Sequence, residues 1–406
     1  MDSKRVLVVS QHYKPEDFRI NDIVPKLLED GFEVDVLCGL PNYPEGEWAE
    51  GYSGKGPFKE QDGPVTIYRA REVRRKGNTS IRIFLNYISW PVFAWLKAGS
   101  LPKAYDCIFC YNTSPVLMCW PANKMARLCK AKLVTYVLDI WPENLYTVLD
   151  IKNKRLRKIA QWYSDRAYKR ADVLVTMSET LKGTLQQRLG DKCPQVEVVP
   201  QHAEDFYAQP MESPEELVEF GQGACMLAFT GNFSPAQNLD GVISAVAAAR
   251  KASGIDIRLL LVGDGMSRTA LEQQVSDLGA NEYVCFTGRV APQQVPAYAA
   301  AADAMVLSLS KDPALELVIP AKVASYMAMS KPIVGSLDGE GANAIVQAEC
   351  GMVAPAGDID ALARVMVDFA QTTLEQRNAF GAKAHAYYQE NFSRDAVIGK
   401  LEDLMR

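Results

Sequence analysis

The segment from residue 312 to residue 343 holds the side chains whose types and spacing point most directly to chemistry. It reads DPALELVIPAKVASYMAMSKPIVGSLDGEGAN, which predicts a loop, a helix, a strand and a Gly-rich loop in succession. Pro320 is expected to open the helix at its first turn, where its missing N–H is no loss and unpaired N–H groups attract phosphate. Lys322 falls in that turn, which usually favours acidic residues, so a nearby anion explains it better than helix stability does. A solvated lysine on an ordinary helix is the alternative.

Two further loops carry groups that can move a proton. Asp139 and Glu143 belong to the segment DIWPEN, after the run KLVTYVL, and His12 belongs to the segment QHYKPEDFRIND, after the run RVLVVS. Loops that follow parallel strands are where α/β sheets bind ligands, so we predict these three residues as catalytic candidates. The alternatives are loop hydrogen bonding for His12 and Asp139 and an early helical turn for Glu143.

Strand-like and helix-like runs alternate along the chain, which predicts an α/β protein with parallel sheets. With 406 residues, the chain is long enough for two doubly wound Rossmann-like domains of about 200 residues each. The acidic connector MESPEELVEFGQG places the boundary near Ala208, which gives domains 1–207 and 208–390. Strands are expected at residues 5–10, 34–37, 65–71, 106–111, 132–138, 173–176, 196–200, 226–232, 257–263, 283–288, 304–308 and 333–334.

Composition narrows the class of protein. Nine cysteines at no repeating interval argue against a disulfide framework, and Cys107 and Cys110 lie in an apolar run typical of a packed strand. Residues 1–200 carry 30 Lys and Arg against 23 Asp and Glu, whereas the remainder carries 14 against 26. The first half is therefore the one that can lie on an anionic surface. No nucleic-acid-binding motif is present, and the first residues lack the pattern of a signal peptide.

Residues 74–97 combine a basic beginning with an aromatic, apolar body. Asn86, Pro91 and Lys97 interrupt the apolar run, so it is too short to span a bilayer. It is typical of an amphipathic segment in the membrane interface, with a second basic run at residues 152–158. A helix packed on the N-terminal domain is the alternative. The expected anchors are Phe84, Tyr87, Trp90, Phe93 and Trp95, and the expected headgroup contacts are Arg74, Arg75, Lys76 and Arg82.

The motifs together resemble retaining GT-B glycosyltransferases of the family-four type, in the branch that builds capsule, O-antigen and exopolysaccharide repeat units. The resemblance rests on P-x-K-x-x-x-Y-M-A-x-x-K-P-I-V followed by D-G-E, and extends through HYKPEDFRINDI, GLPNYPEG, YNTSP, DIWPEN, TGNFSPAQNL and LVGDG. It implies two domains facing a central cleft, a C-terminal helix at 391–406 that packs back across the boundary, and sugar transfer without metal or other cofactor. The donor-binding residues it implies are Lys322, Arg19, Gly231, Asn232, Gly263, Asp264, Arg289, Glu316, Pro320, Ser325 and Glu340.

The chain departs from the family pattern at several positions. Where many relatives carry two glutamates for the sugar and the ribose, Leu317 and Ser325 stand here, with Glu316 one residue away. The loop cations that relatives use for the diphosphate are also replaced, and Asn232 is among the neutral residues found there. Positive charge must then come from elsewhere, and Lys322 and Arg19 are the candidates.

The resemblance implies transfer of a hexose or N-acetylhexosamine from a nucleotide diphosphate, with UDP favoured, to a polyprenyl-diphosphate-linked acceptor. This predicts a cytoplasmic protein, peripheral on the inner face of the cell membrane. Two alternatives stay open. A nucleotide-sugar 2-epimerase has a similar architecture but needs carboxylates and histidine together, and this chain has three histidines. A non-catalytic sugar-nucleotide binding protein fits the missing glutamate and loop cations.

Overall fold

The computed structural model describes residues 3–142 and 153–406. They form two compact units, Met1–Val199 with Ile398–Arg406 as unit 1 and Pro200–Val397 as unit 2. The chain passes from unit 1 to unit 2 before the predicted boundary near Ala208 and returns within its last helix, α15 (Arg394–Met405). Glu143 and Lys152 lie outside the described residues, so the structure gives no account of them.

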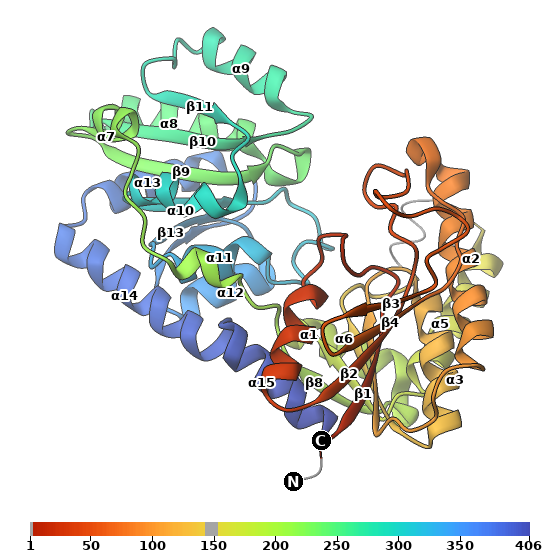
Figure 1. The fold of residues 1–406 in the computed structure, drawn as a ribbon. Helices are drawn as coiled ribbons and strands as arrows, with labels where there is room; N and C mark the ends of the chain where they lie inside the picture. The colour runs from red at the N-terminus through yellow and green to blue at the C-terminus, as the bar shows by residue number, and fades with distance from the viewer. Residues whose placement is uncertain (1–2, 143–152) are drawn as a thin grey trace. The chain divides into compact units, whose positions relative to one another are not determined.

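Unit 1 is built on an eight-stranded sheet with the order β3-β4-β2-β1-β5-β6-β7-β8 (Figure 1). All neighbouring strands pair in parallel except β3 and β4. The strands are β1 (Arg5–Val9), β2 (Glu33–Cys38), β3 (Lys59–Asp62), β4 (Val65–Arg69), β5 (Cys107–Asn112), β6 (Lys132–Val137), β7 (Val173–Thr176) and β8 (Gln195–Val198). The helices are α1 (Ile20–Glu29), α2 (Ser80–Ala98), α3 (Cys119–Cys129), α5 (Lys154–Tyr168) and α6 (Glu179–Leu189).

Unit 2 is built on a six-stranded parallel sheet with the order β11-β10-β9-β12-β13-β14. The strands are β9 (Cys225–Asn232), β10 (Ile257–Asp264), β11 (Val284–Gly288), β12 (Ala304–Ser308), β13 (Ile333–Ser336) and β14 (Gly351–Ala354). The helices are α7 (Glu215–Gly221), α8 (Leu239–Ser253), α9 (Arg268–Asp277), α10 (Val295–Ala300), α11 (Ala321–Ala328), α12 (Gly339–Gln347), α13 (Ile359–Ala370) and α14 (Leu374–Asn391), with the start of α15.

Strand order reverses once in each sheet. In unit 1, β1 lies between β2 and β5, and in unit 2, β9 lies between β10 and β12. At each of these two central strands, the connections to the two neighbouring strands run over opposite faces of the sheet. The loops that follow the central strands lie at this switch point, which is where doubly wound sheets bind ligands. The predicted fold class of two Rossmann-like parallel-sheet domains is confirmed.

The central strands are apolar on both faces because helices cover both sides of a parallel sheet. Every residue of β5 is buried, including Cys107 and Cys110, as expected of strand packing. The prediction missed β3, which it assigned to a polar surface loop. The sequence of β3 is KEQD and only one of its four residues is even partly buried, so no apolar alternation marks it as a strand.

The segment 74–97 folds largely as α2, and two of its predicted roles are wrong. Trp90, expected at the membrane interface, is completely buried, and Arg75, expected at a headgroup, is buried at 7% exposure. Phe84, Phe93 and Trp95 are exposed as expected. Within the described parts of the chain, none of the helices combines the length and the apolar character needed to cross a bilayer.

Candidate functional site

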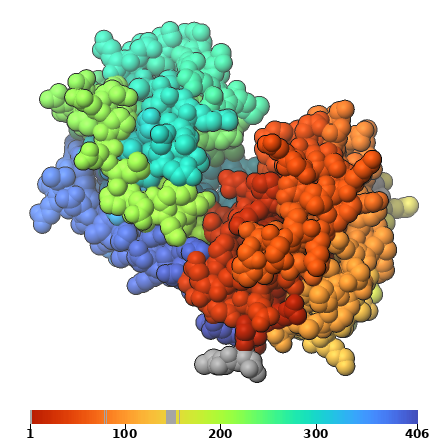
Figure 2. Space-filling view, viewed as in Figure 1, coloured from red at the N-terminus to blue at the C-terminus, as the bar shows by residue number. Residues whose placement is uncertain are grey.

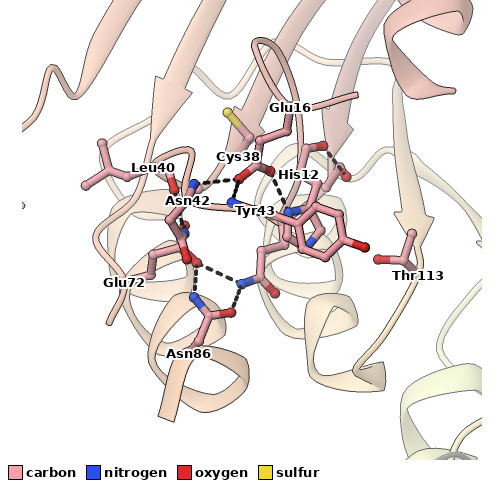
Figure 3. Close-up of polar contacts among 12 residues, drawn as sticks. His12, Glu16, Cys38, Leu40, Asn42, Tyr43, Glu72, Asn86 and Thr113 are labelled. Atoms are coloured by element: carbon pink, nitrogen blue, oxygen red, sulfur yellow. Dashed lines mark hydrogen bonds and ion pairs between the residues drawn. The ribbon is translucent and has the colours of Figure 1, made fainter. Parts of the chain in front are cut away.

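In unit 1, His12 lies in the loop after the central strand β1 and is only 5% exposed. Its Nδ1 lies 2.6 Å from Glu16 Oε2 (Figure 3). Its ring stacks on Phe18 with centroids 4.5 Å apart. Nε2 lies 3.5 Å from a guanidinium nitrogen of Arg75, which can only donate. This network assigns the proton of the neutral ring to Nδ1 and leaves Nε2 as the acceptor.

Glu16 fixes the orientation of His12 because its own position is fixed. Its Oε1 accepts hydrogen bonds from the backbone N–H of Asn42 at 2.6 Å and of Tyr43 at 2.7 Å (Figure 3). The carboxylate therefore joins the loop after β1 to the loop after β2 while it holds the imidazole. A histidine oriented by a carboxylate is the arrangement that general bases and nucleophile activators use.

A second buried carboxylate, Glu72, lies beneath this pair. It accepts hydrogen bonds from Gln11 Nε2 at 2.7 Å, Asn86 Nδ2 at 2.9 Å and Asn42 Nδ2 at 3.2 Å. Burial, followed by the nearby negative charge of Glu16, raises the pKa of Glu72 to about 8. Glu72 is therefore mainly protonated near neutral pH, and the network supports the loops without adding a full buried charge.

Arg75 completes the unit 1 cluster. Its guanidinium lies over the rings of Tyr43, at 5.2 Å, and Tyr87, at 5.0 Å, and its Nε donates to Asn86 Oδ1 at 3.0 Å. This is the physical reason that Arg75 faces inward rather than toward a membrane. A cation held next to His12 Nε2 can attract a negatively charged substrate group to the loop edge.

Asp139 follows β6 and is half-buried, while β5 lies between β6 and β1 in the sheet. Neighbouring strands are about 4.8 Å apart, so the strands that lead to His12 and Asp139 are about 10 Å apart at the same carboxyl edge. The described residues that follow Asp139 are held in place at Trp141, because Trp141 Nε1 donates to Ser114 Oγ at 2.7 Å and Ser164 Oγ donates to the Trp141 carbonyl at 2.7 Å. Arg19 precedes α1 at this edge. Burial raises the pKa of the Tyr111 hydroxyl, and the positive charge of Arg19 offsets part of that rise.

In unit 2, the central strand β9 ends in a glycine turn. Gly231 and Gly263 pair across β9 and β10 with φ of 133° and 140°, values that L side chains rarely adopt. A Cβ on Gly263 would lie 1.9 Å from the Gly231 carbonyl oxygen, and one on Gly231 would lie 2.7 Å from Lys322 Cε. Both positions therefore need glycine, and the turn leaves room for the lysine.

Lys322 lies over this turn, in the first turn of α11. Its Nζ donates to Gln237 Oε1 at 2.6 Å and lies 4.7 Å from the centroid of the Phe229 ring. Desolvation lowers the pKa of Lys322 to about 8. Among the described residues no carboxylate lies within ion-pair distance of its ammonium group. A partly desolvated cation with only neutral partners is suited to receiving an anion.

The other predicted donor residues of unit 2 surround the same sheet edge. Pro320 precedes α11 as its N-cap rather than standing inside the first turn, and the Glu340 N–H donates to the Glu316 carbonyl at 2.9 Å. Ser325 is buried and its hydroxyl donates to the Ala321 carbonyl at 3.3 Å. The remaining three lie at or after the ends of β9, β10 and β11, namely Asn232, Asp264 and Arg289.

Known proteins share this architecture and parts of this sequence. The crystal structure of Anabaena HepE in complex with UDP superposes with a TM-score of 0.67 at 15% identity and covers 99% of both chains. The family model "Glycosyltransferase Family 4" matches residues 19–201, and "Glycosyl transferases group 1" matches residues 224–372. The chain belongs to the GT-B glycosyltransferases. This confirms the predicted resemblance and favours the transferase over the epimerase and the non-catalytic binding protein.

Curated relatives of this glycosyltransferase are distant in sequence. The 2-deoxystreptamine glucosyltransferase of Streptomyces kanamyceticus is 27% identical over 40% of this chain. The matched region spans 42% of the length of that relative. WcaI of Escherichia coli (strain K12), a glycosyl transferase assigned to colanic acid biosynthesis, is 23% identical over 85% of this chain and 83% of its own length.

The sequence of the glycosyltransferase predicts His12 as a candidate but does not predict the residues that hold it. Glu16 stands four residues after His12 in the same loop, a spacing that could have suggested the pair. Asn86 interrupts an apolar run, and a polar residue inside such a run often marks a buried hydrogen-bond network, as it does here. No local sequence pattern indicates the role of Glu72, because its hydrogen-bond partners come from distant parts of the chain.

Proposed function

We propose that this glycosyltransferase moves a hexose or N-acetylhexosamine from a UDP-sugar to a lipid-linked acceptor during synthesis of a bacterial surface polysaccharide. The observation that carries the proposal is the environment of Lys322, a desolvated ammonium group beside the Gly231 turn at the switch point of unit 2. The relatives support the substrate classes. HepE is crystallised with UDP and with UDP-glucose, and the name of WcaI refers to colanic acid biosynthesis.

The proposed reaction keeps the anomeric configuration and uses no metal. The acceptor hydroxyl oxygen forms the new bond to C1 of the sugar, and the bond from C1 to the β-phosphate oxygen breaks. Lys322 stabilises the negative charge that grows on the departing diphosphate. Asp139, Glu143 and His12 are the candidates to hold the acceptor hydroxyl and take its proton, and His12 Nε2 can take it once the hydroxyl replaces the 3.5 Å contact from Arg75.

We also propose that α2 and α5 attach the enzyme to an anionic membrane surface. The exposed apolar side chains of α2 include Ile81 at 73% and Leu96 at 57% exposure. The part of the chain that contains α2 is drawn in orange in Figure 2. On α5, Ile159 and Trp162 are about as exposed, and Lys154, Arg155, Arg157 and Lys158 supply positive charge. Apolar side chains among cations are typical of an interfacial helix.

Binding and transfer assays test the proposal. Purified protein is incubated with a panel of UDP- and GDP-sugars, and its melting temperature is measured, because a ligand at 100 times its Kd adds about 2.7 kcal/mol to the free energy of unfolding. The stabilising sugar nucleotide is then supplied with polyprenyl-diphosphate-linked acceptors and the product is analysed. Stabilisation by a UDP-sugar and a product with retained configuration are expected. Stabilisation by GDP-sugars alone, or product formation with inversion, would contradict the proposal.

A further inference from the structure

Arg75, in the loop after β4, is a buried cation that lacks an ionised partner. Only 7% of the residue is exposed, and among the described residues no carboxylate lies within ion-pair distance of its guanidinium group. The charge of Arg75 acts on Glu72, but the pKa of Glu72 is raised to about 8, so this group is mainly protonated near neutral pH. A buried charge without an opposite charge is costly, and a ligand that supplies one removes that cost.

The contacts of Arg75 leave one edge of the guanidinium group for a ligand. Its central carbon lies over the rings of Tyr43 and Tyr87, and its Nε donates to Asn86 Oδ1. Nη2 lies 3.5 Å from His12 Nε2, which is longer than an ordinary hydrogen bond. Nη1 donates to none of the described residues, and it is not among their fully enclosed unpaired atoms. The two terminal nitrogens can therefore donate a pair of parallel hydrogen bonds to a carboxylate.

Tyr43 supplies an apolar surface beside this edge. It is 41% exposed, and its ring centroid lies 5.3 Å from that of His12 (Figure 3). The half-buried ring of Phe18 lies at the same distance from Tyr43. Aromatic side chains with a few placed polar groups are typical of small-molecule sites, and a pyranose ring has apolar C–H faces that fit them. One small region therefore offers an aromatic surface, a proton acceptor and a cation.

The charge and the spacing of these groups limit the anion that fits. Two cations of the neighbouring loops are already paired, Arg74 with Glu47 and Lys14 with Asp62. The single guanidinium edge of Arg75 matches one carboxylate, whereas a diphosphate carries at least two negative charges. Because Nη2 lies 3.5 Å from His12 Nε2, the reacting hydroxyl and the anion must belong to neighbouring atoms of the acceptor.

We infer that the acceptor ends in a hexuronate, the sugar to which the enzyme adds the next residue. In a hexuronate the C4 hydroxyl and the carboxylate on C5 occupy neighbouring ring carbons, so His12 Nε2 receives the hydroxyl and Arg75 the carboxylate. The ring lies against Tyr43. This inference rests on the proposed function and names the class of its acceptor. It differs from recognition of the lipid-linked diphosphate, because that group is attached at C1.

The carboxylate also acts on the chemical step. The hydroxyl oxygen forms the bond to C1 of the donor sugar, UDP leaves with the electron pair of the broken bond, and the hydroxyl proton passes to His12 Nε2. A second positive charge then forms 3.5 Å from the Arg75 guanidinium group. Like charges at this distance repel, and a carboxylate bound to Arg75 offsets the repulsion. An acidic acceptor should therefore react faster as well as bind more tightly.

Four lipid-linked acceptors with the same diphosphate test the inference. They end in D-glucuronate, in D-galacturonate, or in the amides of these acids, which are neutral and have nearly the same shape. The donor is the UDP-sugar that stabilises the protein. For one acid or both, we expect the full-length parent protein to have a kcat/KM about 10-fold to 150-fold higher than for the amide, the range for a hydrogen bond to a charged group. If neither acid is used better than its amide, the inference is wrong.

Substitutions in the loop after β4 assign the preference to one residue. Arg75→Gln should lose the preference for the acid while its Kd for UDP stays unchanged, and Arg75→Lys should keep part of it, because lysine retains the charge without the paired donors. Acid and amide are compared in the same protein sample, so the ratio of their kcat/KM values does not depend on the fraction that is folded. Arg71→Gln, which removes an exposed cation of the same loop, is the matched control and should keep the preference.

The outcomes separate this inference from the proposed function. Retained preference in Arg75→Gln, or an equal loss in Arg71→Gln, would overturn the role of Arg75. Weaker UDP binding by Arg75→Gln would place Arg75 at the donor and would also overturn it. If only neutral lipid-linked acceptors give product, the hexuronate fails and the proposed function stands. If no lipid-linked acceptor gives product with any UDP-sugar, both fail.

Discussion

Replacing Lys322 by Met should make the protein more stable and make its nucleotide binding weaker. In the folded protein the pKa of Lys322 is lowered to about 8 from the ordinary 10.5 of a lysine. Each unit of pKa difference between the folded and unfolded protein corresponds to about 1.36 kcal/mol. Burying the charged ammonium group therefore lowers the free energy of unfolding by about 3 kcal/mol at pH 7. Met removes this penalty and also the hydrogen bond from the charged ammonium group to Gln237, worth about 1.5–3 kcal/mol, which leaves a gain of at most about 1.5 kcal/mol.

The pH dependence has a definite sign. Between about pH 8 and pH 10.5 the unfolded chain binds a proton that folded Lys322 does not, so the penalty disappears and the parent protein gains stability from this group as the pH rises. The Lys322→Met variant should lack this gain. Urea denaturation of both proteins at pH 7 and pH 9.5 measures the difference directly.

The cost of the substitution appears in binding. A hydrogen bond to a charged group contributes about 1.5–3 kcal/mol, so we expect the Kd for UDP to rise by about 10-fold to 150-fold in calorimetry at pH 7. Affinity of the parent protein should also fall above pH 8, as free Lys322 loses its proton. Lys331→Met is the matched control. Burial also lowers the pKa of Lys331, but its ammonium group donates to the carbonyls of Ala300 and Ala302.

The control variant should lose stability and keep the UDP affinity of the parent protein. If Lys322→Met binds UDP as tightly as the parent protein does, Lys322 does not contact the diphosphate.

Three further predictions concern unit 1. Asp139→Asn keeps the shape and removes the charge, so turnover should fall by about 10²-fold or more with donor affinity unchanged if Asp139 is the general base; turnover within a few-fold of the parent would move the role to Glu143 or His12. Glu72 binds its proton more tightly in the folded protein, so its contribution to stability should be lost as the pH rises from about 4.5 through about 8. In urea denaturation at pH 6 and pH 8.5, Glu72→Gln should lose less stability than the parent; equal losses would refute this reading. Flotation with anionic vesicles should weaken as salt rises, because surface charges are screened within about 10 Å at 0.1 M salt; equal binding to neutral vesicles in high salt would exclude the electrostatic contribution.

The alternation of strands and helices was readable because parallel strands buried on both faces appear as short continuous apolar runs. The glycine turn at Gly231 was also predictable, since a close backbone approach leaves a glycine in the sequence. The orientation of α2 about its own axis could not be predicted from the sequence. Its sequence is apolar around most of the helix, so periodicity could not show that Trp90 faces the core while Trp95 faces solvent. The partners of Arg75 and Glu72 depend on contacts between distant segments, which no local pattern encodes.

Both described ends of the chain belong to unit 1, and this has a consequence for how the protein can be divided. The Lys4 ammonium group donates to the Arg406 carbonyl, Glu402 and Asp30 share a hydrogen bond, and the Arg406 guanidinium lies 5.1 Å from the centroid of the Phe32 ring. Unit 2 is in effect an insertion into unit 1. A contiguous gene fragment can encode unit 2 alone, whereas a fragment ending at Val199 lacks the segment Ile398–Arg406 that covers the turn between α1 and β2. Unit 1 is therefore better produced as a circular permutant, with its two ends joined by a short linker and unit 2 removed.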